Sequence, residues 1–228
     1  MEPTITNRES SDSISLVTLS NNPPTCTMSY SQFRHGETSR HHIHPWEHEV
    51  YIISGTGTLY CDDVAYSVGA GQGIFIPPNV DHYMINDGKQ EILSRVEVNP
   101  LLAAQSGGSK EKGGGTGEPP IIRHYSLIEK NSNLLINTDD GATNFVTLFN
   151  GAMKPGTSSH ASTQGHRHEW EHTVYILEGQ GSITCDGKDY RIKAGDGILI
   201  PGNLHHQWHN NSDADMLRIT FNPVSSLK

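Results

Sequence analysis

The sequence predicts an all-β protein made of two similar halves, and three observations carry this prediction. Hydrophobic residues make up only 34% of the 228 residues, and the chain has 23 glycines and 12 prolines, which suits many short strands better than long helices. Runs of β-branched and aromatic residues, such as 50–53 and 198–200, end at glycine or proline. His42 and His82 recur as His166 and His206, both 124 residues later (166 − 42 and 206 − 82), which indicates a tandem duplication.

The expected strands follow in the same order in each half. In the first half they cover residues 14–19, 25–33, 50–53, 58–61, 65–68, 74–76, 82–85 and 92–98. In the second half the clearest cover residues 145–149, 175–177, 198–200 and 217–221. Asp62-Asp63 and Asp186-Gly187 predict hairpin turns, because aspartate and glycine accept the left-handed backbone that such turns need.

This order also sets the expected domain boundaries. Residues 1–12 are polar and are expected to form a disordered arm. Residues 13–100 form an N-terminal domain, and residues 121–228 form a C-terminal domain of the same kind. Residues 101–120 are rich in glycine, serine and lysine without periodicity, which predicts a flexible linker.

Charge and cysteine content narrow the partners and the compartment. Lysine and arginine total 16 against 25 acidic residues, a formal net charge of -9, and the lack of a basic tract argues against nucleic acid and anionic membranes as partners. The N-terminus shows no signal peptide, and no apolar run approaches the ~18 residues that span a bilayer. Three cysteines are too few for a disulfide framework, so we expect reduced thiols in a cytoplasmic protein.

Each half carries histidines at a spacing that suits a metal site. His42 and His44 alternate, so their side chains point to the same face of an extended segment, and His48 follows four residues later. The second half repeats the pattern at His166, His168 and His172. Three neutral imidazoles that converge on one point suit a divalent transition metal. Two complete sets at fixed spacing argue against a purely structural role.

A second cluster follows in each half and carries a family resemblance. The first consists of Gly71, Pro77, Asn79, His82 and Asn86. The second repeats it at identical spacing as Gly195, Pro201, Asn203, His206 and Asn210. Together with the preceding histidines, these motifs resemble the two signature motifs of a bicupin, a chain with two tandem cupin domains. Asparagine stands at 79 and 203 where the family often has glycine, but asparagine also accepts positive φ.

The resemblance implies two tandem cupin-type jelly-roll β-barrels. It assigns four metal ligands to each domain: His42, His44, His48 and His82, then His166, His168, His172 and His206. His48 and His172 replace the usual glutamate ligand, which is similar to an all-histidine subgroup, several of whose members hold manganese. Manganese or iron is therefore favoured, one ion per domain, with zinc, nickel, copper and cobalt as alternatives.

Residues beside the ligands are candidates for supporting roles. Glu47 and Glu171 precede His48 and His172 and are general acid/base or hydrogen-bonding candidates, but strand alternation points them away from the metal, which favours the structural role. The halves diverge beside the last ligand. The second half has Gln207 and His209 where the first has Tyr83 and Ile85, so we expect most turnover in the second domain.

Three function classes fit these features. The first is a metal-dependent oxidoreductase of the dioxygenase type, acting on a small, oxygen-rich substrate that chelates the metal. The second is a metal-dependent lyase or isomerase of a small acid or sugar derivative, and the third is a metal or carboxylate sensor without turnover. The expected partners are a small-molecule substrate and, as a possible homodimer, a second copy of the chain.

Overall fold

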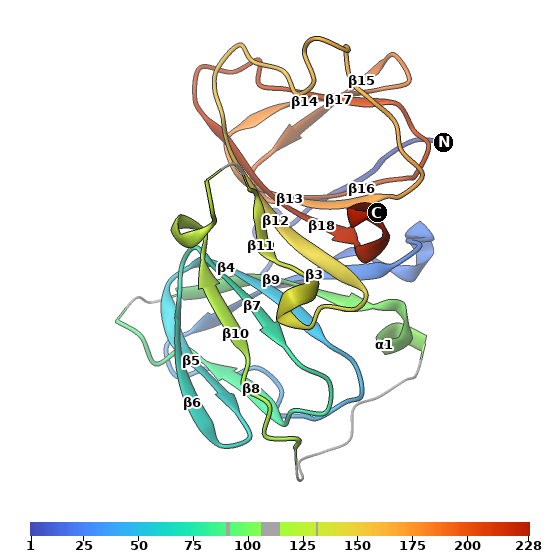
Figure 1. Cartoon of the computed structure of the whole chain (residues 1–228). Coiled ribbons are helices and arrows are strands. Elements are labelled where there is room, and N and C mark those ends of the chain that lie inside the picture. The colour runs from blue at the N-terminus through green and yellow to red at the C-terminus, as the bar shows by residue number, and fades with distance from the viewer. Residues whose placement is uncertain (90–91, 106–114, 131) are drawn as a thin grey trace.

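The computed structural model describes residues 1–89, 92–105, 115–130 and 132–228. The described chain is nearly all β and forms two barrels stacked on one another, the first in blue and green and the second in yellow to red (Figure 1). This confirms the predicted fold class of two tandem jelly-roll barrels. No described helix is long and apolar enough to cross a membrane.

The first barrel consists of two antiparallel sheets. The larger has the strand order β10-β7-β4-β9-β3-β2 and the smaller β6-β5-β8. The strands of this half are β2 (Ser13–Val17), β3 (Cys26–Arg34), β4 (His48–Ser54), β5 (Thr56–Cys61), β6 (Val64–Gly69), β7 (Gln72–Ile76), β8 (His82–Ile85) and β9 (Ile92–Pro100). Alternate residues of these strands, including Val50, Ile74 and Met84, fill the interior between the sheets.

The second barrel repeats the arrangement. Its larger sheet has the order β1-β16-β13-β18-β12-β11 and its smaller sheet β15-β14-β17. Its strands are β11 (Leu134–Ile136), β12 (Phe145–Met153), β13 (His172–Glu178), β14 (Gln180–Cys185), β15 (Lys188–Lys193), β16 (Asp196–Ile200), β17 (His206–His209) and β18 (Met216–Pro223). The described helices are short: α1 (Leu101–Gln105) and the 3-10 turns η1 (Leu19–Asn21), η2 (Tyr125–Leu127), η3 (Thr138–Asp140) and η4 (Val224–Leu227).

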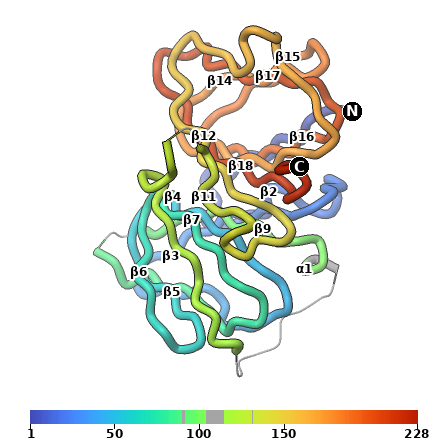
Figure 2. Tube along the Cα trace, viewed as in Figure 1, coloured from blue at the N-terminus to red at the C-terminus, as the bar shows by residue number. Residues whose placement is uncertain are grey.

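The two halves exchange their edge strands. β1 (Thr4–Asn7) pairs with β16 of the second half, and β10 (Ile121–His124) pairs with β7 of the first. The N-terminal segment accordingly runs beside the upper barrel (Figure 2). Ile5 and Ile122 are equivalent in this exchange, because Ile5 pairs with Ile198 and Ile122 pairs with Ile74.

The exchange corrects two expected boundaries. Residues 1–12 are not a disordered arm, because residues 4–7 complete the edge of the second half's large sheet and Ile5 packs on its core. Residues 121–124 belong to the sheet of the first half, so the structural boundary lies after them. Within the predicted linker, residues 101–105 form the short helix α1, and residues 106–114 lie outside the described residues.

A shared core joins the barrels. The outer faces of the two large sheets pack on one another through residues such as Met28, Tyr51, Val98, Phe145 and Tyr175. These residues come from strands of both halves, which bury apolar surface that a single barrel would expose. The interface fixes the second barrel against the first and so fixes the positions of the two histidine clusters.

Candidate metal centres

The ligand-bearing segments of each half meet by backbone hydrogen bonds. In the first half, the His42 and His82 amides each donate to the other residue's carbonyl, at 3.2 and 2.9 Å. The same bridge joins His166 and His206, at 3.1 and 2.9 Å. The Asn79 amide also donates to the His44 carbonyl at 2.7 Å, with Asn79 at φ 60°. These contacts bring segments about 40 residues apart in sequence to one end of the barrel.

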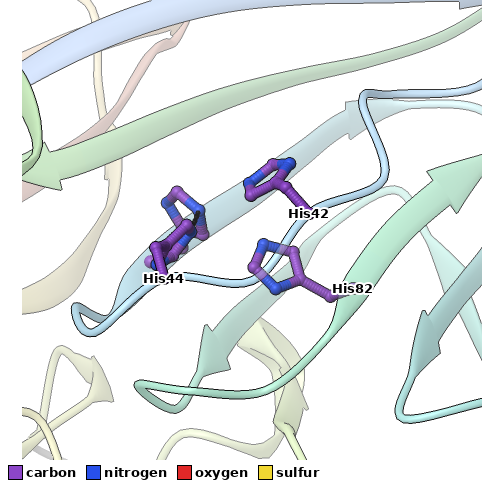
Figure 3. Close-up of side chains that lie close together, drawn as sticks. His42, His44 and His82 are labelled. Carbon is purple, nitrogen blue, oxygen red and sulfur yellow. Dashed lines mark hydrogen bonds between the residues drawn. The ribbon is translucent and has the colours of Figure 1, made fainter. Parts of the chain in front are cut away.

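All eight predicted ligands gather into two groups of four. One ring nitrogen from each of His42, His44, His48 and His82 lies within 4.8 Å of the others, and the same holds for His166, His168, His172 and His206. His42, His44 and His82 point toward one another (Figure 3). Each half therefore holds one histidine group suited to a metal ion.

Hydrogen bonds from the outer ring nitrogens orient the imidazoles. Nδ1 of His44 lies 2.8 Å from the Trp46 carbonyl, and Nδ1 of His82 lies 2.8 Å from the Val80 carbonyl. A carbonyl oxygen only accepts, so in each ring Nδ1 carries the hydrogen and Nε2 presents its lone pair to the centre. His168 and His206 repeat these bonds to the carbonyls of Trp170 and Leu204.

The inner nitrogens fit a cation. Nε2 of His44 lies 2.6 Å from Nε2 of His48, and in the second half the corresponding atoms of His168 and His172 are 2.9 Å apart. In the described part of the chain, Nε2 of His82 and Nε2 of His206 are buried without a hydrogen-bond partner. Lone pairs that converge without a donor are costly unless a cation lies between them, so these residues fit a divalent metal.

Burial keeps the imidazoles neutral. Desolvation, together with the neighbouring imidazoles, lowers the pKa of His44 to about 3 and that of His82 to about 4. In the second half burial lowers the pKa of His172 to about 3 and that of His166 to about 4. A neutral imidazole is the form that binds a metal, so both groups are ready to coordinate at neutral pH.

The two groups differ in the residues behind their third histidine. Nδ1 of His48 lies 3.8 Å from the Glu97 carboxylate, which pairs with Arg95 at 2.9 Å. Burial opposes ionisation of Glu97, but Arg95 and then His48 hold its pKa well below the ordinary value. In the second half Nδ1 of His172 instead lies 2.6 Å from the Asn222 side-chain oxygen. Behind its third histidine the first centre therefore has a buried carboxylate paired with Arg95, where the second centre has the neutral side chain of Asn222.

A cavity of about 170 Å³ opens beside the second group. Its lining includes His166, His172, Trp208, Arg218 and Thr220. His160, from the loop that lengthens the second half, also lines it and meets the His166 ring edge-on, with ring centroids 4.0 Å apart. The second centre is therefore reached from a small chamber whose walls are partly polar and partly apolar.

The candidate glutamates lie behind the ligands rather than among them. Glu47 is fully buried and accepts hydrogen bonds from the Thr143 hydroxyl at 2.6 Å and from the amides of Thr143 and Asn144. It therefore ties the first centre to the second half. Glu171 is also buried, but its Oε1 has no hydrogen-bond partner among the described residues. The strand registers make Pro24 the counterpart of Thr143, and proline has no amide hydrogen to donate.

Gln207, His209 and Tyr83 lie on the strand face opposite the ligands. The Gln207 side chain donates to the Ser159 carbonyl at 2.8 Å, and Nδ1 of His209 lies 2.7 Å from the Ser158 hydroxyl. Tyr83 stacks on Tyr60 with ring centroids 4.8 Å apart. The structure brings none of these three described side chains to the histidine groups, because strand alternation turns them away from His82 and His206.

The sequence reasoning did not single out the arginines of the last strands. Counting back from the Asn-Pro pair that ends each half gives Arg95-x-Glu97-x-Asn99 in the first and Arg218-x-Thr220-x-Asn222 in the second. Period-two alternation places each triplet on one strand face. Aligning the two triplets could have identified these arginines from the sequence, and it shows that Thr220 stands in the second half where Glu97 stands in the first.

A protein-family comparison identifies both halves. The model described as "Cupin domain" matches residues 29–96 and again residues 152–221. The chain belongs to the cupin family. The predicted bicupin resemblance is thereby confirmed, and each matched segment contains one complete histidine group.

Curated relatives of this cupin match over part of their length. Protein SchB from Streptomyces halstedii is 35% identical over 75 residues, which cover 32% of this chain and 54% of SchB. Polyketide synthase CurC from Streptomyces cyaneus is 28% identical over 109 residues, which cover 46% of this chain and 68% of CurC. The chain thus spans about half to two thirds of these relatives.

Solved structures share the fold of both barrels together. Protein Ylba from E. coli superposes with a TM-score of 0.73 at 14% identity, covering 97% of this chain and 90% of Ylba. Oxalate decarboxylase from Bacillus subtilis, described with Mn(II) centres, gives 0.69 at 14%, covering 96% and 76%. A salicylate 1,2-dioxygenase variant from Pseudoaminobacter salicylatoxidans gives 0.67 at 12%, covering 94% and 77%. At these identities the likeness shows a shared bicupin fold.

Proposed function

We propose that this bicupin is a metal-dependent oxidoreductase of the dioxygenase type, acting on a small, oxygen-rich molecule that chelates the metal. The observation that carries the proposal is the convergence of four imidazoles in each half, with one ring nitrogen of each within 4.8 Å of the others. Four neutral ligands leave the full divalent charge on the ion, and an octahedral ion would keep two positions for other ligands.

Manganese or iron is the proposed metal. Either ion, when bound, supplies a Lewis acid that takes oxygen ligands and a redox centre for chemistry with oxygen. The chain's own part is to hold the site. The Nδ1 hydrogen bonds fix the imidazoles, and burial keeps protons off them. The Mn(II) centres of oxalate decarboxylase and the activity of salicylate 1,2-dioxygenase, both on this fold, support this choice.

A lyase or isomerase is the second candidate, and the likeness to Polyketide synthase CurC favours it. Polyketide intermediates carry 1,3-dicarbonyl groups, whose two oxygens chelate a metal and whose enolates a Lewis acid stabilises without oxidation. The third candidate is a sensor that binds a carboxylate without turnover. The same histidine geometry serves all three, so a reaction has to separate them.

Oxygen uptake is the deciding measurement. Protein loaded with manganese or iron is given acetylacetone as a 1,3-diketone probe and salicylate as an aromatic acid probe, in an oxygen electrode. Oxygen consumption coupled to probe loss supports the dioxygenase. Probe loss under argon, or with zinc in place of the redox metal, supports the lyase or isomerase instead. Tight binding of a probe that is not consumed under any of these conditions supports the sensor.

The matched variants assign any activity to one half. His44→Ala with His82→Ala removes two ligands from the first group, and His168→Ala with His206→Ala removes their counterparts from the second. The duplication makes each pair the control for the other. If activity remains after the substitutions in the first group and is lost after those in the second, turnover takes place in the second half, as the sequence predicts.

A further inference from the structure

Arg218 reaches the chamber of the second centre from β18. Arg218, Thr220 and Asn222 alternate along this strand, and all three line the cavity. Asn222 holds His172 at one end of the row, and Thr220 donates to Asn150 at 2.6 Å in the middle. Arg218 lies at the other end, so a ligand in the chamber lies between the guanidinium and the histidine group.

No acid neutralises Arg218 in the part of the chain that the structure describes. Its guanidinium carbon lies 4.8 Å from the centroid of the Trp208 ring, whose face favours a cation without cancelling its charge. None of the described residues that line the cavity is acidic, and no ion pair of Arg218 occurs among the described residues. Burial lowers the pKa of Arg218 to about 10, which still leaves the group charged at neutral pH.

The first half shows what a neutralised counterpart looks like. Arg95 occupies the position equivalent to Arg218, since each lies five residues before the final proline of its half. It pairs with Glu97 at 2.9 Å, and its Nε donates to the Ser31 hydroxyl at 3.3 Å. Thr220 replaces Glu97 in the second half and is an uncharged partner of Asn150. The duplication kept the arginine in both halves and the acid in one.

We propose that Arg218 is the anion-binding residue of the second centre and that it receives a carboxylate of a small ligand held at the histidine group. A planar guanidinium matches a carboxylate with two parallel hydrogen bonds, and a partly buried site strengthens such charge-assisted bonds. The inference rests on the proposed metal-dependent function and specifies that its substrate is an anion. The first centre, whose arginine is paired with Glu97, is not selective for anions.

The chamber's size limits the ligand. At about 30 Å³ for each water-sized group, a volume of 170 Å³ holds about five or six such groups. A small mono- or dicarboxylate fits this space. The polar walls supplied by Asn150, Ser159 and Asn222 suit the remaining oxygens of such a ligand.

Calorimetric binding tests the inference without turnover. Full-length protein is loaded with zinc in both groups, because zinc has no redox chemistry, and is titrated with malonate and with malonamide, its neutral counterpart of similar shape. We expect one strong malonate site per chain and at least tenfold weaker binding of malonamide. Arg218→Gln should weaken malonate binding by at least about tenfold, in the range of a lost charged hydrogen bond.

Two exchanges between the halves make the test independent of damage to the fold. Thr220→Glu keeps Arg218 but gives it the partner that Arg95 has, and should weaken malonate binding as Arg218→Gln does. Glu97→Thr releases Arg95 and should add a second malonate site. Each variant is accepted only if it still binds two zinc ions.

The inference is overturned if malonate and malonamide bind equally, or if Thr220→Glu binds malonate as the wild type does. An absence of oxygen uptake with intact, Arg218-dependent malonate binding would sink the proposed oxidoreductase and leave the anion site standing. Oxygen uptake together with malonate binding that does not depend on Arg218 would support the oxidoreductase and refute the anion site.

Discussion

The Nδ1 atom of His172 lies 2.6 Å from the side-chain oxygen of Asn222, which fixes the ring and leaves Nε2 for a metal. Asn222→Ala removes this contact, and we expect the metal affinity of the second group to fall by about 10–100-fold. Competition with a chromophoric chelator measures it. Asn99→Ala is the matched control, because the Asn99 side chain donates to Glu97 and makes no hydrogen bond to a histidine among the described residues. Equal losses in both halves would contradict the assigned role of Asn222.

Two metal ions per chain are expected, because each half keeps four histidines within 4.8 Å of one another. His44→Ala with His82→Ala should reduce the content to one ion, and so should His168→Ala with His206→Ala. Elemental analysis of the purified protein counts the ions, and circular dichroism checks the fold. Two ions retained in either double variant would refute the ligand assignment for that half.

The metal-stripped protein should lose stability as the pH falls below about 6.5, the ordinary value for histidine. Burial lowers the folded-state pKa of His44 and His172 to about 3 and of His82 and His166 to about 4. Between these values the unfolded chain binds more protons, so the free energy of unfolding rises with pH through the window and is lost on acidification. For the buried His44 the slope approaches about 1.4 kcal/mol per pH unit.

Urea unfolding at pH 7 and pH 5 measures this dependence in protein treated with a chelator. Metal-loaded protein is the comparison, since bound metal keeps the imidazoles unprotonated and stabilises the folded state by mass action. An unchanged midpoint between the two pH values in the stripped protein would show that these histidines already bind protons in the folded state.

The histidine groups were predictable because their geometry is local. Alternation sets the relation of His42 to His44, and the exact repeat at His166 and His168 made chance an inadequate explanation. The same alternation correctly predicted that Glu47 points away from the first metal centre, and it hydrogen bonds to Thr143 instead. Strand alternation also points Gln207 and His209 away from the second metal centre, toward Ser159 and Ser158. The prediction that these two residues face the substrate did not take this alternation into account.

The exchanged edge strands and the state of Arg218 depend on long-range placement. Residues 4–7 look like a polar arm in sequence, because a four-residue edge strand is too short to show a recognisable hydrophobic pattern. The sequence alignment on the final Asn-Pro pairs, which the strand registers of β9 and β18 support, makes Thr220 equivalent to Glu97, but whether Arg218 has a partner depends on which residues face it across the barrel. Contacts of this kind are set by tertiary structure rather than by local pattern.

Glu47 should contribute more to stability than Glu171, although both are buried. Glu47→Gln disturbs an acceptor of three donors from Thr143 and Asn144, and we expect a loss of about 1–3 kcal/mol in the free energy of unfolding. Glu171→Gln is the matched control, because Oε1 of Glu171 has no hydrogen-bond partner among the described residues. Urea unfolding compares the two. A larger loss for Glu171→Gln would contradict the role of Glu47 in joining the halves.

The exchanged strands predict that each end segment stabilises the opposite half. Ile5 packs on the core of the second barrel and Ile122 on that of the first, at equivalent positions. Both are partly buried, so replacing either with alanine should cost about 1–2 kcal/mol. Hydrogen exchange resolves where the loss falls, because edge pairing protects the amides of the neighbouring strand.

Ile5→Ala should raise exchange in β16, far from it in sequence, and leave β7 unchanged. Ile122→Ala should raise exchange in β7 and leave β16 unchanged. Each variant is thus the control for the other, and both keep all eight histidines. If Ile5→Ala left β16 protected as in the wild type, residues 4–7 would not be a working part of that sheet. The second half would then hold its histidine group without help from the N-terminus.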